Sequence, residues 1–165
     1  MMIPIPAIYE RAVIGAMPSK AGDMFDIVIG LDHSLVEQLI AHSRNDEDDA
    51  LHKHTSDRLR FGEGSYEDWF GKNRTPYALV ASNGDLAAIA WFGPKPIGRK
   101  SLRYLSEEEL KKEYALGDGD AHTVVYRSYP PYRGIGLMTK FMQFVIGDYK
   151  ARHPDAKLWA GVSTH

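Results

Sequence analysis

The sequence predicts a domain of the α/β or α+β class, in which helices flank a central sheet. Short apolar and β-branched runs alternate with amphipathic helical patterns, in the order strand, two helices, hairpin, strand, helix, strand. One helix separates the last two predicted strands, and such a crossover favours a parallel pair. Because the chain has 165 residues, we expect a single domain that spans residues 1–165.

The composition excludes several functional classes. The chain carries 20 basic and 22 acidic residues, a net charge of −2, so no overall positive field attracts nucleic acid or a membrane. It contains no cysteine, which excludes disulfides, thiolate metal ligands and thiol nucleophiles. No apolar run approaches the roughly 18 residues of a membrane helix, and the N-terminus does not resemble a signal peptide. We expect a cytoplasmic protein that binds neither nucleic acid nor membranes.

The first predicted elements are a strand and two helices. Residues 25–31 form a short β-branched run, which is typical of a strand. Ser34 and Glu37 form a capping box that predicts the start of a helix. One face of this helix is apolar and consists of Leu35, Val36, Leu39 and Ile40. Ser65 and Asp68 predict the start of a second, short helix in the same way.

Two segments of the first half give weaker signals. Residues 1–24 predict no element, and residues 43–64 are polar throughout. The polar segment holds the triplet 52–54 (His-Lys-His) and the acidic run 46–49, which raise the alternative of a metal site. No fixed ligand spacing supports a metal, so we favour a solvated segment and expect no metal site.

The middle of the chain predicts a β-hairpin. Residues 77–82 and 86–92 are apolar strand-like runs joined through Asn83-Gly84. Asn-Gly is a strong hairpin signal because both central residues of the tight turn need positive φ. Ser106 with Glu109 predicts the start of an additional helix further along.

The last three predicted elements are a strand, a helix and a strand. Residues 122–128 are β-branched and predict a strand. Residues 137–152 have the clearest helical periodicity of the chain, and the proline at 154 ends the pattern. Residues 157–162 predict the final strand, which would lie parallel to the preceding one.

The segment between that strand and helix, YPPYRGIGLMTKFM (residues 129–142), is suited to bind an anion. The N-terminus of a helix carries a partial positive charge and unpaired N–H groups. Gly134 and Gly136 allow the backbone to approach a bulky ligand, and Arg133 adds a permanent charge. The segment therefore predicts a phosphate or pyrophosphate site, although it matches neither the P-loop nor the dinucleotide fingerprint.

This stretch resembles the acetyl-CoA-binding motif of the GNAT N-acetyltransferase superfamily. The matching residues are Arg133-Gly134-Ile135-Gly136-Leu137-Met138, with Pro130 at the usual proline position, although Met138 stands where the family prefers glycine or alanine. The resemblance implies a mixed, mostly antiparallel sheet whose splayed parallel pair forms the cofactor cleft. It also implies acetyl-CoA as acyl donor, a small-molecule or protein amine as acceptor, and no metal. In the family the region between the first two helices borders the acceptor site, so the acidic run 46–49 is a candidate for recognising a cationic amine, and the alternative is a solvated face.

The resemblance further implies which residues bind the cofactor. The predicted cofactor-binding residues are Tyr126, Arg127, Ser128, Arg133, Gly134, Ile135, Gly136, Leu137, Met138 and Thr139. The strand 122–128 contains no carboxylate that would serve as the usual general base. His122 is our candidate catalytic base because imidazole accepts protons near neutral pH, and the alternative is a surface histidine. Asp118 and Asp120 are further candidates, whose alternative is turn formation.

The resemblance also predicts more chain than the sequence contains. The family continues after a strand such as 157–162 with an asparagine, a helix and a hairpin that often carries a tyrosine acid. We therefore expect the domain to be incomplete at its C-terminus, and its uncovered edge strand to favour pairing of two copies in a homodimer. The alternative to an N-acetyltransferase is a catalytically silent acyl-CoA-binding or interaction module.

Overall fold

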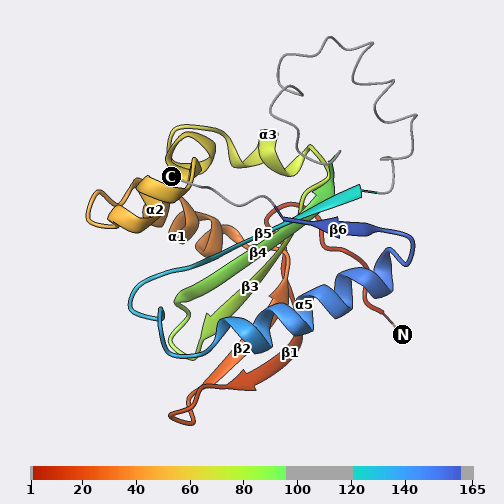
Figure 1. Cartoon of the computed structure of the whole chain (residues 1–165), viewed down its shortest axis with the longest axis horizontal. Helices are drawn as coiled ribbons and strands as arrows, with labels where there is room; N and C mark the ends of the chain where they lie inside the picture. The colour runs from red at the N-terminus through yellow and green to blue at the C-terminus, as the bar shows by residue number, and fades with distance from the viewer. Residues whose placement is uncertain (1, 96–120, 161–165) are drawn as a thin grey trace.

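A computed structural model describes residues 2–95 and 121–160, and in this part the chain forms one six-stranded sheet of order β1-β2-β3-β4-β5-β6 (Figure 1). The strands are β1 (Ala12–Pro18), β2 (Met24–Ile29), β3 (Thr75–Ala81), β4 (Leu86–Pro94), β5 (Ala121–Ser128) and β6 (Lys157–Trp159). All neighbours are antiparallel except β5 and β6, which are parallel. The predicted fold class, a mixed and mostly antiparallel sheet flanked by helices, is confirmed.

Helices cover both faces of this sheet. They are α1 (His33–Arg44), α2 (Asp49–His54), the π-helical turn η1 (Arg58–Gly62), α3 (Tyr66–Phe70) and α5 (Met138–Arg152). The helix α5 lies alone across one face, and the other described helices lie on the opposite side (Figure 1). No helix within residues 2–95 and 121–160 is both long and apolar enough to cross a bilayer.

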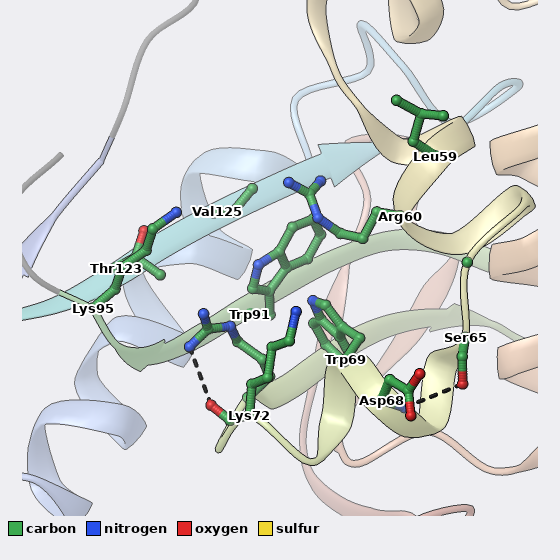
Figure 2. A pocket seen from close by; sticks show the side chains of 12 residues that line it. Leu59, Arg60, Ser65, Asp68, Trp69, Lys72, Trp91, Lys95, Thr123 and Val125 are labelled. Atoms are coloured by element: carbon green, nitrogen blue, oxygen red, sulfur yellow. Dashed lines mark hydrogen bonds between the residues drawn. The ribbon is translucent and has the colours of Figure 1, made fainter. Parts of the chain in front are cut away.

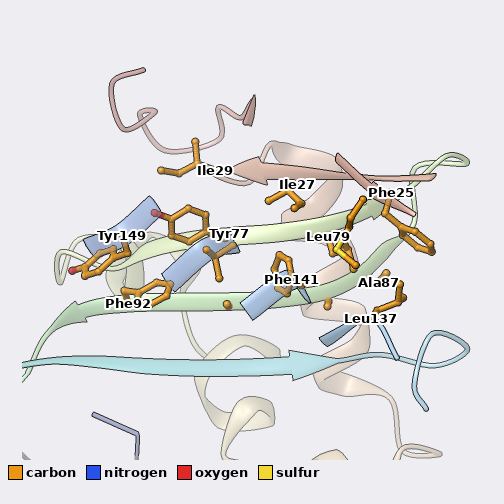
Figure 3. Packing of buried hydrophobic residues seen from close by; sticks show 14 of the residues in the cluster. Phe25, Ile27, Ile29, Tyr77, Leu79, Ala87, Phe92, Leu137, Phe141 and Tyr149 are labelled. Carbon is orange, nitrogen blue, oxygen red and sulfur yellow. The ribbon is translucent and has the colours of Figure 1, made fainter. Parts of the chain in front are cut away.

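The sheet is buried between two apolar clusters. On the α5 face, Leu137, Phe141 and Tyr149 pack against side chains of β2, β3 and β4 (Figure 3). On the other face, Leu35 and Leu39 of α1 pack with Trp91 of β4 and with the aromatic residues of η1 and α3. Because β3 and β4 are buried on both faces, they fix the central sheet on which β5 is placed.

Local signals in the sequence locate most of these elements. The predicted hairpin β3–β4 is confirmed and turns at Asn83-Gly84. Gly84 has φ +92°, but Asn83 has no positive φ, so this is not the two-residue turn with positive φ at both positions. The Ser65 hydroxyl accepts a hydrogen bond from Asp68 N at 3.2 Å, so the predicted cap of α3 is confirmed. The predicted strand at 122–128, the helix after it and the parallel pairing with the last strand are also confirmed. Of the predicted strand 157–162, residues 157–159 form β6, residue 160 does not, and residues 161–162 lie outside the described residues.

Three details differ from the prediction. Helix α1 is capped by Asp32, whose carboxylate accepts from Leu35 N at 2.9 Å, and not by Ser34. The polar segment 43–64 forms α2 and η1, and residues 12–18 form an unpredicted strand. The predicted helix that begins near Ser106 lies outside the described residues.

The unpredicted strand β1 depends on contacts that are distant in sequence. A Cβ atom at Gly15 would lie 2.6 Å from Cζ of Phe144, so any larger residue there would require the partly exposed Phe144 ring to shift. The glycine weakens the local strand signal and at the same time permits the packing that forms the strand.

Candidate functional site

The strands β5 and β6 separate after a short ladder. Their pairing joins residues 121–123 to 157–159, whereas β5 continues to Ser128 along β4. A cavity of about 410 Å³ opens where the described residues leave the outer edge of β5 unpaired, and we call it the cleft. The cleft is lined by Ala50, Leu51, His54, Thr55, Val124, Val125, Tyr126, Arg127, Ser128, Arg133 and Ala160.

The loop between β5 and α5, which we call the glycine loop, reaches the cleft through Arg133, whereas residues 134–139 are not among those that line it. Gly134 and Gly136 have φ values of +73° and +79°, a conformation that L side chains rarely adopt. No side chain caps α5 at Leu137, so the first-turn N–H groups have no side-chain acceptor there. Lys20, from the β1–β2 turn, packs over Gly136 and brings an additional cation to the loop.

Some side chains of the predicted motif lie in the core and others lie at the surface. Leu137 is buried in the α5 cluster and Met138 packs against it, so both offer only their backbone to a ligand. The departure from the family at Met138 is therefore accommodated, because its side chain points into the core. Ile135 and Thr139 are exposed beside the loop.

Arg133 joins the loop to helix α2. Its guanidinium forms a bidentate ion pair with the Asp48 carboxylate at 2.7 and 2.8 Å, and its Nε donates to Ser128 O at 2.8 Å. Burial raises the pKa of Asp48, but the hydrogen bonds from Arg133 and from Leu51 N outweigh it and leave that pKa below its ordinary value. Arg133 thus positions the loop and one wall of the cleft, and its contact with a phosphate stays a prediction.

A buried ion cluster fixes the floor beside the cleft. The Asp57 carboxylate is fully buried and accepts from Arg127 Nε at 2.7 Å and from Arg60 Nη1 at 2.6 Å. Both guanidinium groups also lie over the ring of Trp91, at 5.2 Å for Arg127 and 5.4 Å for Arg60. This cluster holds η1 against β4 and β5.

Two further cavities extend the cleft along the same face of β5. A middle cavity of about 350 Å³ shares His54, Thr55, Val125 and Arg127 with the cleft. An end cavity of about 420 Å³ shares Arg60, Lys95, Thr123 and Val125 with the middle cavity (Figure 2). The three spaces form one groove. It begins at Arg133 in the β5–α5 loop and ends between η1, α3 and the end of β4.

His122 lines none of the three cavities, although Val124 and Tyr126, on the same face of β5, line the cleft at the edge of the strand. Its Nδ1 is 2.6 Å from the hydroxyl of Tyr149 on α5, and its ring also packs beside His153. Thr123 and Val125, which alternate with it along β5, line the groove instead. The geometry therefore does not bring His122 to the cleft, and its catalytic role stays a prediction without support from its position.

His54 lines both the cleft and the middle cavity. It is the last residue of α2 and is exposed. Sequence reasoning considered it only as part of a metal-like triplet, because nothing local shows that α2 ends beside β5. Asp118 and Asp120, the other candidate bases, lie outside the described residues.

The acidic run 46–49 does not line the groove. Asp46 pairs with Arg58, and Asp48 pairs with Arg133 and caps α2 through Leu51 N. Within the described ranges no three His, Cys, Asp or Glu side chains gather as a metal site, and His52 Nε2 instead contacts Asn45 O at 2.5 Å. Asp46 and Asp48 therefore stabilise the region around α2 and bring no negative charge to the groove.

Comparison with known proteins identifies the fold. No protein-family model matches the sequence, and no curated protein matches it. Among solved structures, the crystal structure of the GNAT domain of S. lividans PAT matches with a TM-score of 0.58. The match covers 91% of this chain and 78% of that chain at 12% identity. The chain has the fold of that GNAT domain.

Proposed function

We propose that this protein is an N-acetyltransferase that moves an acetyl group from acetyl-CoA to a primary amine. The observation that carries the proposal is the cleft, which lies along the part of β5 that the described residues leave unpaired, is lined by Arg133 of the glycine loop and continues into the groove. An extended pantetheine arm would bond to backbone groups of residues 124–128 along this edge, apart from Tyr126 O and Ser128 O, which accept from Arg127 Nη1 and Arg133 Nε. The pyrophosphate would lie on the loop 133–139, where backbone N–H groups and Lys20 favour an anion.

The proposal gives the two reactants separate places in the groove. The thioester would lie at the junction of the cleft and the middle cavity, and the acceptor amine would enter through the middle cavity. The neutral amine attacks the thioester carbonyl carbon, a C–N bond forms, the C–S bond breaks, and the CoA sulfur leaves as a thiolate. The proton lost by the nitrogen passes to the imidazole of His54 and from there to solvent or to the thiolate.

We expect wild-type protein to release CoA from acetyl-CoA in the presence of an amine, and His54→Gln to lower kcat about 100-fold, as loss of a general base does. The affinity for acetyl-CoA should be unchanged, because the variant keeps the cleft and the loop. The measurement is thiol release with saturating acetyl-CoA, together with calorimetric binding of acetyl-CoA.

The matched control is His52→Gln, on the same helix but outside the residues that line the groove. Its kcat should stay close to that of the wild type. Equal kcat values for the two variants would remove His54 from the proton path. Acetyl-CoA binding without turnover of any amine would indicate a silent acyl-CoA-binding module instead.

A further inference from the structure

The end cavity of the groove is strongly cationic although the chain as a whole is slightly acidic. Its basic lining residues are Arg60, Lys72, Arg74 and Lys95. Asp68 is the single acidic residue among those that line it. The side chains of Lys72 and Arg60 extend toward the indole rings of Trp69 and Trp91, with Lys95 at the rim (Figure 2).

Three separate parts of the chain bring these four cations together. Arg60 comes from η1, Lys72 and Arg74 from the connection between α3 and β3, and Lys95 follows β4. Arg60 is held by Asp57, and Arg74 Nη1 donates to Lys72 O and Pro94 O at 3.3 and 3.2 Å. These contacts fix two of the guanidinium groups at the wall of the cavity.

The positive charges of Lys72 and Lys95 are not neutralised by any described carboxylate. Within residues 2–95 and 121–160, no carboxylate forms an ion pair with the ammonium group of Lys72 or of Lys95. Desolvation, and after it the charges of Arg74, Arg60 and Lys72, lower the pKa of Lys95. The cations therefore repel one another in a partly enclosed space, and a bound anion would relieve that repulsion.

We propose that the end cavity binds a carboxylate or phosphate group carried by the acceptor, so that the preferred acceptors are small anionic amines. This inference rests on the proposed acetyl transfer. Because Arg60 and Lys95 line both the end and the middle cavity, an oxyanion held between them would leave the amine of the same molecule in the middle cavity, beside His54. The volume of about 420 Å³ suits a small molecule.

A preference for anionic acceptors is the opposite of the recognition of a cationic amine for which the acidic run 46–49 was a candidate. Recognition of a cationic amine would need unpaired carboxylates in the groove, but Asp46 and Asp48 are paired outside it. In the end cavity a cationic acceptor would meet Lys72 and Lys95, which no described carboxylate pairs, and Asp68 is the one acidic residue among those that line it.

Binding of anions can be measured without catalysis, because all three tryptophans of the chain line the groove. Trp69 and Trp91 line the end cavity, and Trp159 lines the middle cavity. We expect succinate and inorganic phosphate to change the tryptophan fluorescence saturably, and neutral succinamide to leave it unchanged. A response to succinamide equal to that of succinate, or no response to either anion, would overturn the proposal.

Charge reversal locates the site. Lys72→Glu should weaken succinate binding about tenfold or more, since an attractive contact becomes a repulsive one. Lys72 is exposed, so the variant is expected to fold. Lys157→Glu makes the same change of charge at an exposed residue of β6 outside the three cavities, and its succinate affinity should equal that of the wild type. Equal weakening in both variants would contradict the assignment.

Turnover then connects the anion site to the acceptor. We expect kcat/KM to be at least about tenfold higher for glutamate than for glutaminamide or for spermidine. Lys72→Glu should remove that preference without changing the affinity for acetyl-CoA. An acidic peptide tested alongside distinguishes a protein acceptor, and its preference over glutamate would overturn the small-molecule assignment. If acetyl-CoA fails to bind, the proposed transfer is wrong, whereas the fluorescence titration still decides whether the anion site exists.

Discussion

Gly136→Val is expected to abolish measurable acetyl-CoA binding, with a loss of affinity of about 100-fold or more. The φ of +79° at this position is unfavourable for every L side chain and worst for a β-branched one. A Cβ would also lie 2.9 Å from Cε of Lys20, which would displace the cation that covers the loop. The change therefore both distorts the N–H array and moves a charge away from the expected pyrophosphate position.

The control for this variant must carry the same backbone strain. Gly84→Val places valine at a φ of +92° with no atom within 4 Å of the new Cβ, in the β3–β4 turn. It should destabilise the fold to a similar extent while it retains acetyl-CoA affinity. Calorimetric titration and circular dichroism of both variants separate the two effects. Normal binding by folded Gly136→Val would show that the loop does not face the phosphates.

Asp57→Asn should lower the free energy of unfolding by about 3 kcal/mol or more. The carboxylate is fully buried and compensates two guanidinium groups, so its loss leaves Arg60 and Arg127 together in a space of low polarity. Urea unfolding at neutral pH measures the change.

Asp46→Asn is the matched control, because it also removes a carboxylate from an arginine pair. Asp46 is exposed, with 86% of its side chain accessible, and such pairs contribute at most about 1 kcal/mol. We therefore expect its free energy of unfolding to stay within about 1 kcal/mol of the wild type. A loss for Asp57→Asn no larger than that of Asp46→Asn would mean that the ion cluster does not hold η1 to the sheet.

The predictable part of the molecule is the part with local signals. The Asn83-Gly84 turn, the periodicity of residues 137–152 and the spaced glycines 134 and 136 each determine their surroundings within a few residues. These signals predicted the hairpin, α5 and the loop before it, and the fold class followed from their order.

The groove could not be predicted, because its residues converge from distant parts of the chain. Arg133 and its partner Asp48 are 85 positions apart, and Arg127 and Asp57 are 70 positions apart. Lys72 and Lys95 occur in polar connections without any pattern that marks a site. Only the placement of η1 and the α3–β3 connection against β5 gives these side chains a common cavity.

The central claim is that the cleft and the glycine loop together bind acetyl-CoA, and calorimetric titration of the wild-type protein with acetyl-CoA and with S-acetylpantetheine tests it most directly. Both ligands carry the arm and thioester that would lie along β5, but only acetyl-CoA carries the pyrophosphate that the loop would bind. We predict one acetyl-CoA per chain, bound at least about tenfold more tightly than S-acetylpantetheine. Absence of acetyl-CoA binding, or equal affinities for the two ligands, would contradict the account.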